Sequence, residues 1–331
     1  MKNNSILNDC YIDIKPVEDD IFDCFNGLIV SVAAYYKRTC WSIFASAWGF
    51  YYQHNGNENF GERLHSGKTD TANIFLKRYH GIEIDYRRFN EFNELDQLIQ
   101  NQLSLRLPVV ITLDSYWCPW HLAYQNAKYH LSHNILATGI RKDHCYRCID
   151  PYFTNSVELL PMDHLKNGFR PVCATIKVLD EIERDIDWKE ILDLSINNLK
   201  KNESKDDAFE ALSDFIRDFA DTFDLQKELD GHEKMVAVPL FRQLQDLIVC
   251  RKNFGKMLVY LAEQCAKPEL RGLSEKMGCA SRDWGAVRLL LLRYALKNDF
   301  NFPRDLLVKR LKEILNTEKE IMQTMQSLVV S

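Results

Sequence analysis

The chain has 331 residues, of which 46% are hydrophobic and 27% charged, and its formal net charge at pH 7 is −5. This length predicts about two domains, and the composition is that of a globular protein rather than a disordered or fibrous one. A sequence pI near 6.0 argues against a general nucleic-acid binder. The chain starts without the apolar core of a signal peptide and has no apolar stretch long enough to span a membrane. We therefore expect a cytoplasmic protein whose ten cysteines are reduced thiols.

Up to about residue 180, short β-type runs alternate with helical patterns. The helical patterns predict helices over residues 23–37, 71–80 and 93–105. The β-type runs predict strands over residues 82–86, 109–114, 134–140, 146–150 and 173–178. We therefore expect an α+β domain over residues 1–180.

After residue 180 the strand signal disappears, and apolar residues recur at helical spacing instead. The periodic segments are 205–225, 234–266, 283–297 and 304–328. Prolines interrupt this pattern at Pro268 and Pro303, and the charged stretch 200–207 is interpreted as a hinge or loop. The second predicted domain is a helical bundle over residues 181–331.

The first candidate functional residue is Cys24, which lies at the predicted start of a helix. Asp23 is a typical N-cap residue, so Cys24 falls in the first turn. The unpaired N–H groups and the helix dipole there favour a thiolate. Two readings stay open at this point, because a cysteine at such a place is often simply buried and inert, and the neighbouring Asp23 charge opposes thiolate formation.

The partners of a nucleophilic cysteine are expected in a β-hairpin over residues 134–150. An even number of residues in its turn pairs Ala137 with Cys148. Because side chains alternate between the faces of a strand, His133 and Asp150 then lie diagonally adjacent on one face. The carboxylate can then hold one ring nitrogen and direct the other at a thiol. An odd turn would place the two side chains on opposite faces.

Other chemistry-bearing patterns are weaker. His130, His133, Cys145 and Cys148 have zinc-like spacing, but the two cysteines should face opposite ways on one strand, so we predict no metal site. The glycines are too loosely spaced for a phosphate-binding loop. A polar and aromatic cluster is predicted to line a substrate cleft, although it could instead cap the core: Asp114, Tyr116, Trp117, Trp120 and Tyr152.

Several blocks of the sequence together resemble a known family. They are DCFNGLIVSVAAYY followed by WGFYYQHN, then LPVVITLDSYWCPWHLAY, HLSHNILATGI and CYRCIDPYFTNSVELLPMDHL. In this order they resemble the N-terminal domain of butirosin biosynthesis protein H over roughly residues 18–175. The helical remainder is similar in kind to the C-terminal domain of that family.

The resemblance implies a papain-like (C39-peptidase-like) fold used for acyl transfer in antibiotic biosynthesis. Cys24, His133 and Asp150 match the catalytic Cys, His and Asp of the family. The family takes an acyl group from the phosphopantetheine thioester of a carrier protein and passes it to an amine acceptor, with no bound cofactor. This sequence departs from papain-like proteases because no glutamine stands a few residues before the cysteine. The second donor of the oxyanion hole is therefore not identified from the sequence.

Two alternative functions stay open on the sequence alone. The same three residues would serve a cysteine peptidase, amidase or thioesterase, in which water or a peptide replaces the carrier and the amine. The missing glutamine also fits a non-catalytic binding scaffold with a vestigial cysteine. Thiol reactivity separates the scaffold from the enzymes, because a vestigial Cys24 should react no faster than the other cysteines.

Overall fold

A computed structural model describes residues 10–19, 22–54, 58–67, 70–127, 129–200 and 207–330. The chain divides into two compact units. One, here called the sheet unit, comprises the described residues up to Cys40 together with Leu76–Glu183. The other, here called the helical unit, comprises Trp41–Phe75 and the described residues from Arg184 onward.

This division corrects the prediction of a continuous first domain over residues 1–180. The boundary near residue 180 lies close to the observed change after Glu183, but Trp41–Phe75 belongs to the helical unit. Aromatic packing is the physical reason. Phe50 stacks on Trp284 with ring centroids 5.9 Å apart, and Tyr52 packs edge-to-face on Phe215 at 5.2 Å.

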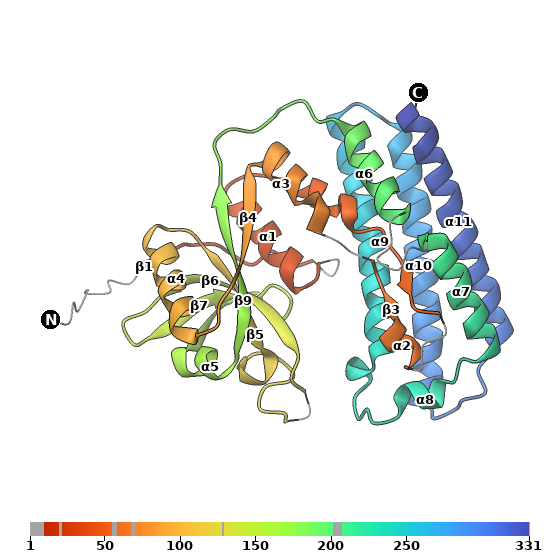
Figure 1. The fold of residues 1–331 in the computed structure, drawn as a ribbon, viewed down its shortest axis with the longest axis horizontal. Helices are drawn as coiled ribbons and strands as arrows, with labels where there is room; N and C mark the ends of the chain where they lie inside the picture. Colours follow the sequence, from red (N-terminus) through yellow and green to blue (C-terminus); the bar gives the residue numbers. More distant parts are fainter. Residues whose placement is uncertain are drawn as a thin grey trace. The chain divides into compact units, whose positions relative to one another are not determined.

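The sheet unit is built on one antiparallel sheet, which confirms the predicted α+β class (Figure 1). Six strands follow in the spatial order β4 (Ile82–Arg88), β9 (Phe169–Val178), β5 (Val109–Asp114), β6 (Ser132–Ile140), β7 (Cys145–Ile149) and β8 (Val157–Pro161). A seventh, β1 (Cys10–Tyr11), also pairs with β6. The helices that accompany the sheet are α1 (Cys24–Tyr35), α4 (Phe92–Ser104) and α5 (Met162–Asn167), and α3 (Asn73–His80) crosses the boundary between the units. The five predicted strands are all present, whereas β1, β8 and α5 were not predicted.

The hairpin of β6 and β7 differs from the prediction at its turn. Ile140 pairs with Tyr146 rather than with Cys145, so the turn has an odd number of residues. His144, with a left-handed φ of 60°, accommodates it. A register shift between Ala137 and Gly139 then inserts one extra residue into β6. Beyond this bulge Ala137 pairs with Cys148, as predicted.

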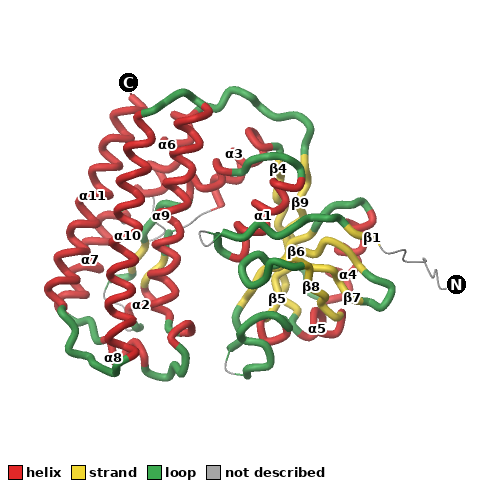
Figure 2. The backbone as a smooth tube through the Cα atoms, turned by 180° about the vertical axis from the view of Figure 1, so that it is seen from behind, coloured by secondary structure: helices red, strands yellow, loops and turns green. Residues whose placement is uncertain are grey.

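The helical unit contains long helices that run side by side in both views (Figures 1 and 2). Its helices are α2 (Phe60–Arg63), α6 (Trp188–Lys200), α7 (Ala208–Asp221), α8 (Leu225–Leu229), α9 (Pro239–Gln264), α10 (Glu269–Leu296) and α11 (Arg304–Val330). A two-stranded ribbon of β2 (Tyr51–Tyr52) and β3 (Leu64–His65) comes from the earlier segment.

Most of the periodic pattern after residue 180 is observed as helix. The segments predicted over 205–225, 234–266 and 304–328 contain α7, α9 and α11. The segment 283–297 covers only the second half of α10, and α6 was not predicted. Most of the predicted hinge over 200–207 lies outside the described residues. In the part of the chain that the structure describes, no helix has the length and apolar character needed to cross a membrane.

A buried ion pair is at the centre of the helical unit. The guanidinium of Arg251 donates to both carboxylate oxygens of Glu318, each at 3.0 Å, and neither residue is more than 2% exposed. The indole N–H groups of Trp48 and Trp284 donate to the same carboxylate at 2.8 and 3.2 Å. Arg251 also donates to the carbonyl oxygen of Gly49 at 2.7 Å, so segment 41–75 and helices α9, α10 and α11 share one polar network.

Replacement of Glu318 by alanine should therefore strongly destabilise the helical unit. The change leaves the Arg251 charge buried without its partner, which typically costs about 3–5 kcal/mol of unfolding free energy. Equilibrium urea unfolding monitored by tryptophan fluorescence measures this loss.

Glu320→Ala is the matched control on the same helix. Glu320 is 62% exposed and pairs with Lys276 at the surface, where an ion pair contributes about 0–1 kcal/mol. Equal losses in the two variants would contradict the importance of the buried pair.

Candidate functional site

Cys24 is the first residue of α1, as the sequence predicts. The Asp23 carboxylate caps this helix by accepting hydrogen bonds from the backbone N–H groups of Phe25 and Asn26, at 3.0 and 2.6 Å. The side-chain amide of Asn26 donates to the second oxygen of Asp23 at 3.0 Å. The Asp23 charge is thus bound by donors of the first helical turn. Cys24 itself is half-buried.

His133 and Asp150 lie on adjacent strands and are hydrogen-bonded. Nε2 of His133 and Oδ2 of Asp150 are 2.6 Å apart, and the residues are 4% and 0% exposed. The indole N–H of Trp120 donates to the same Oδ2 at 2.8 Å. Oδ1 of Asp150 is buried and has no hydrogen-bond partner among the described residues. Asp150 therefore directs one oxygen at both donors and fixes the imidazole plane.

The Cys24 thiol is the second group that acts on the imidazole, and like Asp150 it raises the pKa of His133. Because Nε2 is bonded to Asp150, Nδ1 is the ring nitrogen left for Cys24. Burial alone lowers the pKa of His133, but the hydrogen bonds to Asp150 and Cys24, and their charges, outweigh it and raise the pKa to about 9. At neutral pH the imidazole is therefore protonated, and an imidazolium stabilises a thiolate beside it.

A second histidine lies beside this group. The ring centroid of His121 is 5.0 Å from that of His133 and 4.3 Å from that of Phe153. Burial, followed by the repulsion of the His133 charge, lowers the pKa of His121 to about 4. Its Nδ1 accepts the backbone N–H of Ala123 at 2.9 Å, so the neutral ring carries its proton on Nε2. No residue pattern marks His121 as a site residue, because its hydrogen-bond partner is a backbone N–H group.

The remaining predicted site residues fall into different places. Trp120 contacts Asp150, whereas Asp114 lies in a separate cluster. The Asp114 carboxylate binds His130 at 2.8 Å and Arg170 at 2.7 Å, and it accepts the backbone N–H of Tyr116 at 3.0 Å.

Two predicted aromatic residues accompany the Asp114 cluster, and a third is exposed elsewhere. Tyr116 stacks on His130, and Trp117 packs edge-to-face on Tyr116. Tyr152 is 54% exposed and packs on Phe153. The structure thus gathers Asp114, Tyr116 and Trp117 in one cluster and leaves Trp120 and Tyr152 outside it.

The two cysteines of the zinc-like spacing lie in different environments. Cys148 is fully buried, whereas Cys145 is partly exposed. Burial raises the pKa of both thiols, which opposes the thiolate form that a metal requires. Over the described residues, no group of three or more His, Cys, Asp or Glu side chains is arranged to hold a metal ion.

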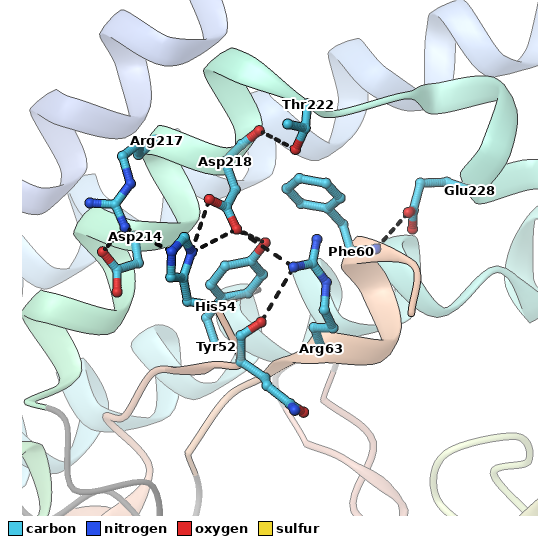
Figure 3. Close-up of polar contacts among 10 residues, drawn as sticks. Tyr52, His54, Phe60, Arg63, Asp214, Arg217, Asp218, Thr222 and Glu228 are labelled. Carbon is cyan, nitrogen blue, oxygen red and sulfur yellow. Dashed lines mark hydrogen bonds and ion pairs between the residues drawn. The ribbon is translucent and has the colours of Figure 1, made fainter. Parts of the chain in front are cut away.

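A cavity of about 320 Å³ lies in the helical unit, lined in part by the residues of Figure 3. Its Asp218 carboxylate accepts from the Tyr52 hydroxyl and bonds to His54 Nδ1, at 2.9 and 3.0 Å, and it pairs with Arg63 at 3.5 Å. Glu228 accepts the backbone N–H groups of Phe60 and Gly61 at 2.6 and 2.9 Å.

These bonds join Tyr52, His54 and residues 60–63 to α7 and α8. The carboxylates of Asp218 and Glu228 thus already accept hydrogen bonds from the protein, and no cysteine is among the residues that line the cavity. We therefore assign the cavity a structural role and place the candidate active site in the sheet unit.

A scan of the chain against models of known protein families finds no match, and a search among curated proteins finds none either.

The pKa of His133 predicts a specific dependence of stability on pH. Below pH 6.5 the imidazole is protonated in both the folded and the unfolded state, so its favourable contacts contribute in full. Between pH 6.5 and about 9 only the folded state keeps the proton, so the unfolding free energy falls as the pH rises. We expect His133→Gln to reduce this decline, measured by urea unfolding across the pH range.

His80→Gln is the control, because the opposite sign applies to His80. Burial, followed by the charge of Arg38, lowers its pKa to about 4, so its contribution is lost as the pH falls from 6.5 towards 4. This variant should change the acid side of the profile and leave the alkaline slope unchanged. An unaltered alkaline slope in His133→Gln would refute the assignment.

Proposed function

We propose that the chain is a cysteine-dependent acyltransferase with Cys24 as nucleophile, His133 as general acid and base, and Asp150 as the residue that orients the imidazole. The observation that supports this most directly is the buried hydrogen bond between His133 and Asp150, together with the effect of the Cys24 thiol on the same imidazole. A nucleophile, a base within hydrogen-bond reach and a group that orients the base are the elements of such catalysis.

The local electrostatics support the same roles. Cys24 lies at a helix N-terminus, whose dipole favours negative charge. The raised pKa of His133 keeps a positive charge beside the sulfur at neutral pH. Burial raises the pKa of the thiols of three other cysteines of the sheet unit, Cys40, Cys118 and Cys173.

The proposed cycle has two half-reactions. The Cys24 thiolate attacks the carbonyl carbon of a thioester and forms a C–S bond, and the donor thiolate leaves and takes a proton from the His133 imidazolium. An amine then attacks the acyl-Cys24 carbonyl, gives a proton to His133, and displaces the Cys24 thiolate as the amide forms. Because thioester exchange is nearly neutral in free energy and amide formation is favourable, no ATP is needed.

The resemblance to butirosin biosynthesis protein H extends this proposal to fold and substrates. The sheet unit is proposed to be papain-like, and the acyl donor is the phosphopantetheine thioester of a carrier protein. The acceptor is a small molecule with an amine, in the biosynthesis of an antibiotic or related secondary metabolite. A cytoplasmic location fits these partners.

Incubation with S-acetylpantetheine, the acetylated minimal arm of such a carrier, tests the nucleophile. We expect intact-mass spectrometry to show one acetyl group per chain, and peptide mapping to place it on Cys24. Cys24→Ala should remain unmodified. Cys279→Ala is the matched control, because Cys279 is exposed and so reports on non-specific acylation.

Acetylation of Cys24→Ala at the wild-type rate would rule out the acyl-enzyme mechanism. Addition of a simple amine then separates transferase from hydrolase. Amide product supports the transferase, whereas free acetate alone favours the thioesterase or peptidase alternative.

Asp150→Asn should impair turnover less than Cys24→Ala or His133→Ala. The nucleophile is bonded to the acyl group in every cycle, and the imidazole moves a proton in both half-reactions. The carboxylate acts only through the imidazole, and an amide oxygen at the same place can still accept the Nε2–H bond. The rate of amide formation from a thioester and an amine in the three variants measures the order, and a loss in Asp150→Asn as large as in His133→Ala would contradict it.

A further inference from the structure

An asparagine that the proposed mechanism does not use lies against the nucleophile. The side-chain Nδ2 of Asn134 is 3.6 Å from the sulfur of Cys24, within the range of a hydrogen bond to sulfur. Asn134 follows His133 directly on β6, so the strand that carries the base also carries this amide.

The orientation of the Asn134 amide is fixed by the neighbouring strand. Thr112 on β5 is the cross-strand partner of Asn134, and its hydroxyl donates to Oδ1 of the amide at 2.8 Å. The opposite, N–H side of the amide therefore faces Cys24. This side is also the one that a thiolate attracts, since a carbonyl oxygen pointing at a negative sulfur would be repelled.

A second donor lies at the same sulfur atom. Cys24 is the first residue of α1, and its backbone N–H is one of those that have no acceptor within the helix. Among the described residues, no backbone carbonyl outside the helix accepts a hydrogen bond from this N–H. Two N–H donors are thus available beside Sγ, one from the backbone of α1 and one from a side chain on β6.

We propose that Asn134, together with the backbone N–H of Cys24, forms the oxyanion hole of the acyl-transfer reaction and takes the place of the glutamine that papain-like enzymes carry before the cysteine. This inference rests on the function proposed above. Asn134 is then a catalytic residue, and Thr112 is a positioning residue that acts through the Asn134 amide.

The step that needs these donors is the addition to the carbonyl. When the thiolate forms its bond to the carbonyl carbon, the π electron pair of the carbonyl moves onto oxygen. That oxygen lies on the carbon bonded to Sγ, next to both donors. When the intermediate collapses, the electron pair re-forms the C=O bond and the donor thiolate leaves. Donors placed for the oxyanion stabilise this intermediate.

The same 3.6 Å contact would also suit a different role, in which Asn134 only stabilises the thiolate. Two reactions of Cys24 distinguish these two roles. Iodoacetamide alkylates the thiolate at a saturated carbon and forms no oxyanion, so its rate reports on the thiolate alone. S-phenyl thioacetate acylates the same sulfur through a tetrahedral oxyanion, so its rate depends on the hole as well.

We expect Cys24 of Asn134→Ala to be acetylated about 10²–10³-fold more slowly than Cys24 of the wild type, which is the usual loss for one oxyanion-hole donor. Its rate of alkylation by iodoacetamide, and the pH profile of that rate, should stay close to wild type. Thr112→Val keeps the Asn134 amide but removes the hydroxyl that orients it. Its rate of acylation should therefore fall less than that of Asn134→Ala, and its rate of alkylation should not change.

Asn167→Ala is the matched control, since Asn167 is an exposed asparagine at the end of α5 in the same unit. It should retain both rates. A wild-type alkylation rate also shows that a variant is folded around Cys24, which keeps loss of acylation interpretable.

Three results would overturn the inference in distinguishable ways. If Asn134→Ala is acetylated as fast as the wild type, the assignment of Asn134 is wrong while the acyltransferase proposal stands. If acylation and alkylation fall by the same factor, Asn134 supports the thiolate rather than the oxyanion. If wild-type Cys24 is alkylated but never acetylated, the proposed function itself fails, and the oxyanion hole with it.

Discussion

A one-residue bulge in β6 is the constraint on which the candidate site depends. The odd turn between β6 and β7 would by itself place His133 and Asp150 on opposite faces of the hairpin. The extra residue, between Ala137 and Gly139, restores the register and returns both side chains to one face. The bulged residue Thr138 is held from two sides, because its carbonyl accepts the Ile12 N–H from the segment after β1 and its hydroxyl donates to Arg147 of β7. Bulges that redirect side chains are common beside active sites.

Burial by itself lowers the pKa of the imidazole at this place, and it is also the largest cause of the low pKa values of His121 and His80. His133 differs from them because the Asp150 carboxylate, which is hydrogen-bonded to it, and the Cys24 thiol both raise its pKa. In the surroundings, Trp120 donates to the same Asp150 oxygen, and the lowered pKa of the nearby His121 keeps that ring uncharged at neutral pH. The charge is thus confined to one ring, the ring that contacts the nucleophile.

Local chemistry made part of this site predictable. The capping preference of aspartate located Cys24 at a helix start, and strand alternation placed His133 with Asp150. The odd turn and the compensating bulge were not predictable, because each follows from backbone geometry that no residue pattern marks; the two errors cancelled. Asn134 was missed for another reason. An asparagine within an apolar strand acquires meaning only when Thr112 opposite it and the helix carrying Cys24 are placed in space.

The segment Trp41–Phe75 also shows why the domain boundary could not be read from composition. Its aromatic residues and its short strands have the same character as those of the sheet unit, so the sequence changes visibly only near residue 180. Packing places this segment in the helical unit. Trp48 donates to the buried carboxylate of Glu318, and Phe60 packs edge-to-face on Phe215 and Phe223. The chain therefore leaves the sheet unit after the helix that carries the nucleophile, contributes a core element to the helical unit, and returns to form the sheet. A fragment limited to residues 1–180 would contain these aromatic side chains but not the helices that bury them. The core of the helical unit is therefore complete only when both of its chain segments are present.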